Sequence, residues 1–127
     1  MAILYLLTVT VSCKKLPYVP DYDHAGGIVI GKETCSSTDP DNDHWLIDLN
    51  VNYTAINNFG DTLTYNGIFY EHVVKTKGLL AAFKTVGKKL AFDCHFSAGK
   101  IITTGCTVAL PVNYALKEMQ VITTFER

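Results

Sequence analysis

Short runs in which apolar and polar residues alternate are the feature that most constrains how this chain folds. They cover residues 26–35, 44–51, 62–75 and 88–96, and stretches rich in Gly, Asn, Asp, Ser or Thr separate them. A period of two sends alternate side chains to opposite faces of a β-strand. Turn-forming residues between such runs are typical of chains built from strands. The pattern therefore predicts an all-β domain.

The dipeptide Asn66-Gly67 makes the most local of these predictions. It lies between two stretches that are rich in β-branched and aromatic residues. A type I′ turn requires a positive φ at both central residues, which Asn and Gly tolerate. We therefore expect residues 62–65 and 68–75 to form two paired strands joined at this turn.

One segment shows helical rather than strand spacing. Apolar residues recur at that spacing within residues 79–86, and Gly87 follows as a residue suited to end a helix. This predicts one short helix of about two turns. Beyond it, the pattern predicts a turn at residues 97–100 and strands at residues 101–110 and 119–125.

Strands interrupted by one late helix have the element order of a small antiparallel OB-like barrel. A β-sandwich is the alternative fold. In either case the apolar positions of the runs should face a common core. The residues expected there are Ile28, Ile30, Leu46, Ile47, Leu49, Leu90, Phe92, Phe96, Val108 and Leu110, with Leu79, Leu80 and Phe83 closing one end.

Length and charge limit the domain count and the partners. A chain of 127 residues with 48% apolar composition is large enough for one domain with its own core. Its formal net charge is -1, whereas proteins that coat nucleic acid usually carry a strong basic excess. We therefore expect a single folded domain and no nucleic-acid partner.

The N-terminal segment has the character of an export signal. The first twelve residues carry no charge, and Cys13, Lys14 and Lys15 follow at once. This run is shorter than the ~20 apolar residues that a spanning helix needs, and it has the length of a signal-peptide core. An apolar strand of a soluble protein is the alternative interpretation.

The stretch Thr10-Val11-Ser12-Cys13 resembles the lipobox of bacterial lipoproteins, in which the cysteine is lipidated and becomes the new N-terminus. The resemblance implies a signal peptide at residues 1–12, membrane attachment through lipid on Cys13, a tether at residues 13–25 and a folded domain at residues 26–127. The segments GIVIGKETC, WLIDL, NGIFYEHVVKT and VGKKLAFDCHF also look similar to small, functionally uncharacterised lipoproteins of the Bacteroidetes. That resemblance implies a place in the bacterial cell envelope, at the outer membrane or facing the periplasm, and it implies no activity.

The remaining cysteines, Cys35, Cys94 and Cys106, allow three pairings. Cys94 shares the apolar face of its strand, which favours a buried free thiol. The turn expected at residues 98–99 would also place Cys94 out of register with Cys106. We therefore expect a disulfide between Cys35 and Cys106, which fits an exported protein.

The sequence contains none of the motifs that would indicate catalysis. It lacks GxSxG, CxxC and HExxH sequences and a glycine-rich phosphate loop. Its four histidines, His24, His44, His72 and His95, are scattered along the chain. We therefore expect a protein that is not an enzyme and that carries no cofactor.

Three carboxylates at alternate positions, Asp39, Asp41 and Asp43, have the spacing of a calcium loop. Against an EF-hand template, however, His44 replaces the glycine of position 6 and Asn50 replaces the bidentate glutamate of position 12. Calcium binding by these three residues is therefore a weak hypothesis beside an ordinary solvated loop.

Three functions from different classes fit the sequence. The first is a non-catalytic binding or structural role at the cell envelope, with a protein or glycan ligand on an aromatic face formed by Trp45, Phe69 and Tyr70. The second is a hydrolase-inhibitor-like module that uses the acidic loop at residues 36–44. The third is an OB-type oligosaccharide or oligonucleotide binder that uses residues 75–89, although export argues against nucleic acid.

Overall fold

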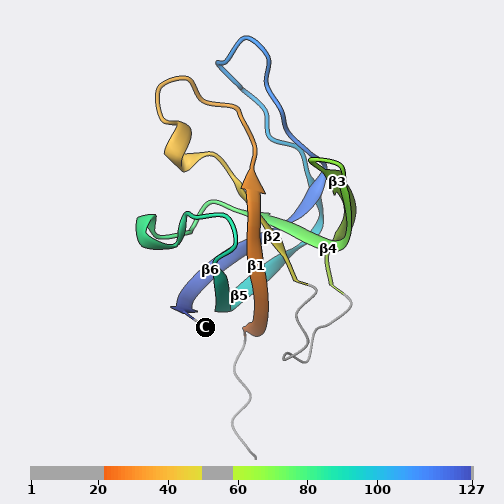
Figure 1. The fold of residues 1–127 in the computed structure, drawn as a ribbon, viewed down its shortest axis with the longest axis vertical. Helices are drawn as coiled ribbons and strands as arrows, with labels where there is room; N and C mark the ends of the chain where they lie inside the picture. The colour runs from red at the N-terminus through yellow and green to blue at the C-terminus, as the bar shows by residue number, and fades with distance from the viewer. Residues whose placement is uncertain (1–21, 50–58, 127) are drawn as a thin grey trace, which may run out of the picture.

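The computed structural model describes residues 22–49 and 59–126 (Figure 1). The signal peptide predicted at residues 1–12, the lipidated Cys13 and the first part of the tether lie outside the described residues. The described part contains six strands and two short 3₁₀ turns. These are β1 (Asp23–Lys32), η1 (Pro40–Asn42), β2 (Trp45–Asp48), β3 (Asp61–Tyr65), β4 (Ile68–Thr76), η2 (Ala81–Phe83), β5 (Lys89–Ile101) and β6 (Leu116–Glu126). No helix in this part is long and apolar enough to cross a membrane.

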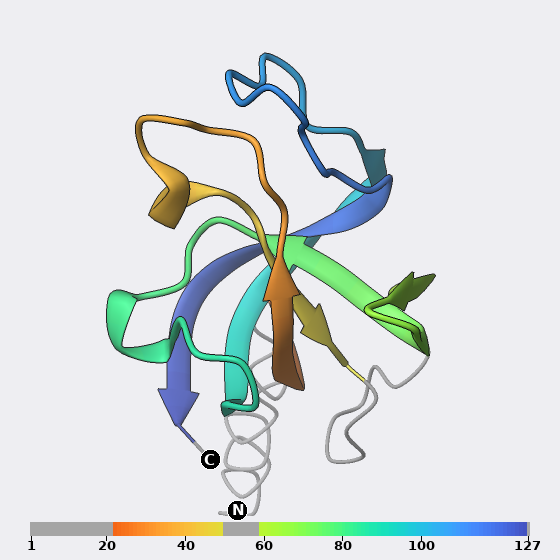
Figure 2. The same cartoon turned by 45° about the horizontal axis from the view of Figure 1, so that its top comes forward.

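The strands form one sheet that closes on itself. Its order is β2-β1-β5-β6-β4-β3, and a further pairing of β2 with β4 joins the two sides into a ring. The pairings are antiparallel except for the parallel contact of β4 with β6 at Lys75 and Glu118. The strongly curved strands wrap around a common interior (Figure 2). This barrel-like ring confirms the predicted all-β, OB-like fold. β3 is not part of the ring and pairs only with β4, at the edge of the sheet.

The β3–β4 hairpin confirms the prediction made from Asn66-Gly67. Asn66 has a φ of 51° and Gly67 a φ of 82°, and Tyr65 pairs with Ile68 across the turn. The strand bounds also agree with the predicted ones to within one residue. A turn that depends on two adjacent residues can be predicted because its cause is local.

The core consists of two clusters of buried side chains. The larger lies inside the ring and the smaller lies under the β3–β4 hairpin. Six residues of the predicted core are buried, and they are Leu46, Ile47, Leu49, Leu79, Leu90 and Phe92. The prediction was wrong for Leu80 and Leu110, which are exposed. Ile28, Ile30, Phe83, Phe96 and Val108 are only half-buried, whereas Val29, which was not predicted, is buried. A register shift between Val29 and Gly31 displaces the pattern of β1.

The predicted helix at residues 79–86 is absent, and only the 3₁₀ turn η2 forms there. Leu80 occupies its N-cap position and makes no side-chain capping hydrogen bond. So short a segment cannot recover the cost of starting an α-helix, and the β-branched Thr85 and Val86 lower its helix propensity further. The segment instead buries Leu79 in the core.

Three predicted segments were placed wrongly. The chain does not turn at residues 97–100, because β5 continues to Ile101 through an irregular register between Phe96 and Lys100. Residues 102–115 form a long loop instead of the predicted strand at 101–110, and the chain returns only in β6. At the other end, residues 23–25 were assigned to the tether but belong to β1, where they pair with β5.

Candidate functional site

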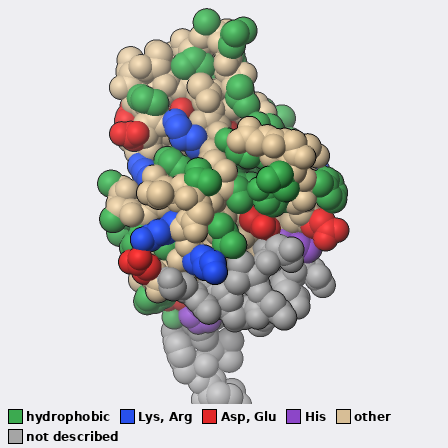
Figure 3. Space-filling model, viewed as in Figure 1, with side chains coloured by type: hydrophobic (Ala, Val, Ile, Leu, Met, Phe, Trp, Pro, Cys, Tyr) green, Lys and Arg blue, Asp and Glu red, His purple; other side chains and the backbone are tan. Residues whose placement is uncertain are grey.

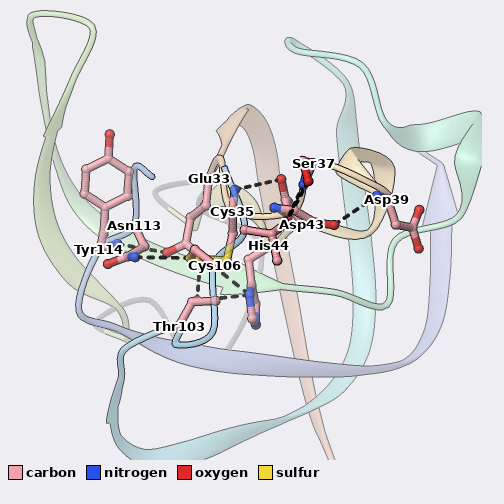
Figure 4. Close-up of a disulfide and its surroundings, with 12 residues drawn as sticks. Glu33, Cys35, Ser37, Asp39, Asp43, His44, Thr103, Cys106, Asn113 and Tyr114 are labelled. Atoms are coloured by element: carbon pink, nitrogen blue, oxygen red, sulfur yellow. Dashed lines mark hydrogen bonds and ion pairs between the residues drawn. A yellow bond between two sulfur atoms is a disulfide. The ribbon is translucent and has the colours of Figure 1, made fainter. Parts of the chain in front are cut away.

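Two loops meet at one end of the ring, opposite the end where β1 begins (Figures 1 and 2). One joins β1 to β2 through residues 33–44, and the other joins β5 to β6 through residues 102–115. We call these two segments the rim. A disulfide between Cys35 and Cys106 connects them, with Cα atoms 4.5 Å apart (Figure 4). The predicted pairing is confirmed, although the turn used to argue for it does not exist.

Backbone and hydroxyl contacts join the two loops further. Thr34 and Val112 pair as an isolated β-bridge. The backbone N–H groups of Thr107 and Val108 donate to the carbonyl of Cys35 at 2.8 and 3.1 Å. The rim is therefore one interlocked unit rather than two independent loops. Disulfides persist in oxidising compartments, so the covalent tie also fits a non-cytoplasmic location.

A buried ion pair lies beneath the disulfide. The side chains of Lys75 and Glu33 are both 0% exposed, and Lys75 Nζ lies 2.9 Å from Glu33 Oε2. The same ammonium donates to Thr103 Oγ1 and to the carbonyl oxygen of Tyr114, each at 2.9 Å. All three donors of the ammonium therefore have a partner, which is the condition under which a buried charge is tolerated.

Glu33 is equally well satisfied. Its Oε1 accepts from the Thr103 hydroxyl at 2.7 Å, and its Oε2 accepts from the Tyr114 backbone N–H at 2.8 Å. Thr103 and Tyr114 lie near the two ends of the loop at residues 102–115, so the pair of Glu33 and Lys75 holds both ends of that loop. Burial, then Tyr65 and Glu33, raise the pKa of Tyr114.

His44 completes the network from the side of β2. Its Nε2 lies 2.7 Å from Glu118 Oε2, and its Nδ1 lies 3.3 Å from Thr103 Oγ1. The same Nδ1 lies 3.5 Å from Glu33 Oε1. Sequence analysis missed this cluster because its members are far apart in the chain and match no motif at fixed spacing. The one hint in the sequence was Lys75, a charged residue that directly follows the apolar Val73 and Val74.

The three predicted calcium ligands play different roles. The carboxylate of Asp43 is buried and accepts the backbone N–H groups of Cys35 and Ser36, each at 3.0 Å. Asp39 and Asp41 are exposed. Among the described residues there is no group of three or more His, Cys, Asp or Glu side chains that could hold a metal ion. The structure thus does not bring the predicted ligands together, and Asp43 shapes the loop instead.

The predicted aromatic face is not assembled either. Trp45 is 9% exposed and belongs to the larger core cluster, whereas Phe69 is 62% exposed. Tyr70 is half-buried and packs against the smaller cluster. Trp45 pairs with Thr76, at the end of β4 far from Phe69. These three side chains therefore do not share one open surface.

A pocket of about 230 Å³ opens between the two loops of the rim. Its lining comes from both loops and from the residue after β4, and most of the lining residues have polar side chains. The lining residues are Cys35, Ser36, Asp39, Asn42, Asp43, His44, Lys77, Thr103, Thr104 and Gly105. The side chains of Asp43, His44 and Thr103 are engaged in the contacts given above, so these three groups are held in place in the pocket wall.

Cys94 is the free cysteine of the described residues, and it is buried inside the ring. Burial, then the nearby Asp23 and Asp93, raise the pKa of its thiol to about 12. Because the thiolate is the reactive form, this cysteine is held in an unreactive state. His95 is exposed on the opposite side of β5, as the alternation of the strand requires.

Comparison with models of protein families, with curated proteins and with solved structures found no match. The rim and the network beneath it are therefore interpreted from their geometry.

Proposed function

We propose that this chain is a non-catalytic binding module of the cell envelope, exported, held on a membrane through lipid on Cys13, and binding its ligand through the rim. One observation carries the proposal: Cys35–Cys106, the Thr34–Val112 bridge and the buried Glu33–Lys75 pair fix two distant loops as one surface. A surface ordered before binding avoids the entropic cost of ordering it at the moment of binding.

The position of the rim in the fold supports the same function. OB folds bind ligands with the loop between their first two strands and the loop between their last two. Here those loops are residues 33–44 and 102–115, the two that the disulfide joins. The fold alone suggests this binding site by analogy, and the two loops joined by the disulfide support it independently.

The direction of β1 fits attachment near the N-terminus. β1 begins at Asp23, at the end of the ring opposite the rim, and runs 10 residues toward it (Figure 1). At about 3.3 Å per residue this strand spans roughly 33 Å. A lipid on Cys13 would therefore hold the rim away from the membrane and toward a partner.

A hydrolase-inhibitor-like module is the second candidate. It is favoured by the long loop at residues 102–115, which projects from the ring and is fixed at its ends and by the disulfide. An oligosaccharide or oligonucleotide binder has less support. Among the rim residues, Tyr114 is the single aromatic side chain and it is half-buried, whereas single-stranded nucleic acids bind through stacked aromatic rings.

Two measurements test the proposal. Full-length protein expressed in a bacterium that lipidates exported proteins should enter the detergent phase on phase separation, and Cys13→Ser protein should remain in the aqueous phase. An aqueous wild-type protein that retains Met1 would refute the anchor. For the binding role, the domain immobilised with its disulfide intact should retain a ligand that it loses after Cys35→Ser and Cys106→Ser replacement. Equal retention by both forms would refute the role of the tied loops.

A further inference from the structure

We infer that the ligand of the rim is a protein whose surface pairs an apolar pocket with basic side chains. This inference rests on the proposed binding function and adds the chemistry of the partner. Leu110 is the residue that would enter the apolar pocket, and Asp39 and Asp41 would face the basic groups.

The apolar half of the argument comes from the loop at residues 102–115. No residue from 101 to 116 carries a charge. Leu110 is 84% exposed, the highest exposure of any large apolar side chain described, and Ile102 and Val112 of the same loop are 56% and 43% exposed. Figure 3 shows several separate hydrophobic groups at this end of the molecule. Exposed apolar side chains grouped on one feature mark an interaction surface.

The acidic half comes from the loop at residues 33–44. Asp39 and Asp41 are exposed, and neither forms an ion pair with a described residue. Two nearby lysines contact the same loop through other atoms, since Lys32 and Lys84 donate to the backbone carbonyls of Pro40 and Asp41 and Lys32 pairs with the carboxylate of Asp43. A partner with basic groups would therefore gain charge complementarity here.

The two loops that carry these halves are joined to each other. The backbone N–H and the hydroxyl of Ser37 contact Thr107 Oγ1 at 2.9 and 3.1 Å, next to the disulfide. Acidic and hydrophobic side chains accordingly lie at the same end of the molecule in Figure 3. An aliphatic side chain beside fixed charges is typical of protein–protein interfaces, which have an apolar centre and a polar periphery. A phosphate backbone would instead be repelled by these carboxylates.

The first experiment places a photoreactive benzoylphenylalanine at Leu110 and, in a matched control, at Ile122. Ile122 is also exposed, at 53%, but it lies in β6, away from the two loops of the rim. The probe is the envelope extract of the source cells. Irradiation should give one discrete, protease-sensitive adduct from position 110 and none from position 122. Identical adducts from both positions, or an adduct from position 110 that resists protease, would overturn the inference.

The second experiment measures how charge affects the yield of that adduct. The double variant Asp39→Lys/Asp41→Lys should lower the yield by about tenfold, whereas Lys77→Glu, which removes the cation of the pocket, should raise it. Higher ionic strength should weaken both effects, since the Debye length falls to ~3 Å at 1 M salt. A yield that is the same in all variants would overturn the inference that the partner presents basic side chains to Asp39 and Asp41.

A capture assay separates failure of this inference from failure of the proposed function. The immobilised domain should retain the crosslinked protein from the same extract, Leu110→Asp should lose about 90% of it, and Ile122→Asp should lose little. Equal retention by Leu110→Asp would overturn the inference but leave the binding function standing. If neither wild type nor any variant retains a component of the extract, both are refuted.

Discussion

Replacing Lys75 with methionine should lower the free energy of unfolding by about 3 to 5 kcal/mol. Lys75 and Glu33 are both 0% exposed, and the ammonium supplies the one cation in contact with Glu33 Oε2 among the described residues. Methionine keeps the length of the side chain but leaves Glu33 with the Thr103 hydroxyl, the Tyr114 N–H and, at 3.5 Å, His44 Nδ1 as partners. The magnitude is therefore that of a buried carboxylate that has lost its lysine rather than of one lost neutral hydrogen bond.

The double variant Lys75→Met/Glu33→Leu tests that explanation. With both charges removed, no buried charge is left unpaired, and the remaining cost comes from the unsatisfied groups of Thr103 and Tyr114. The double variant should thus be more stable than the sum of the two single variants predicts, with a coupling free energy of about 2 to 3 kcal/mol. Buried ion pairs replaced together by apolar residues commonly behave in this way.

Urea unfolding gives the required free energies. Trp45 is the single tryptophan of the chain and is mostly buried, so its fluorescence should report the loss of the core. All four proteins are compared with the disulfide oxidised, and equal slopes against urea would show that the same surface unfolds in each. If the double variant is destabilised by the full sum of the single effects, the claim that Glu33 and Lys75 act as a pair is wrong.

Three further predictions concern the covalent tie, the buried thiol and a constrained glycine. Replacing Cys35 and Cys106 with serine should lower the free energy of unfolding by about 4 kcal/mol, because the disulfide spans a sequence separation of 71, and an unchanged urea midpoint would contradict this. Burial raises the pKa of the Cys94 thiol from 9.0 to about 12, so the stability due to the neutral thiol is complete below the lower value and falls as pH rises toward the higher. Wild type should accordingly lose stability faster than Cys94→Ala over that range, and parallel pH profiles would refute the effect. Gly60→Ala should lower the free energy of unfolding by about 1 to 3 kcal/mol, because the φ of Gly60 is +107° and a Cβ would lie 2.5 Å from the His72 carbonyl carbon. Gly99→Ala is the control: with open space around that position, it should change the free energy of unfolding by less than ~0.5 kcal/mol.

The sequence determined the features whose causes are local. Alternation predicted the strands because each residue of a strand faces the core or the solvent according to its own position. The Asn66-Gly67 turn was predictable because both required φ values belong to the two residues that adopt them. Composition likewise indicated a β-rich chain, whereas the disulfide between Cys35 and Cys106 joins positions 71 apart and was predicted in part from a turn that does not form.

Tertiary structure decided the features that depend on residues far apart in the chain. The extent of β5 was one, since its pairing with β6 extends the strand past Gly99, which by sequence alone indicated a turn. The absence of the helix at residues 79–86 was another, because burying Leu79 in the ring outweighed a weak helical preference. Long-range pairing thus overrode local signals of modest strength.

The rim and its network belonged wholly to the tertiary structure. Glu33 and Lys75 are 42 positions apart, and each read alone is an ordinary surface charge. The closing of the ring brings β1 and β4 together around β2, so that these two charges meet out of contact with water. A lone buried charge would be prohibitively unfavourable, so the presence of the partner decides whether either residue can be inside at all. That dependence on a distant partner is the physical reason why the site could not be predicted from the sequence.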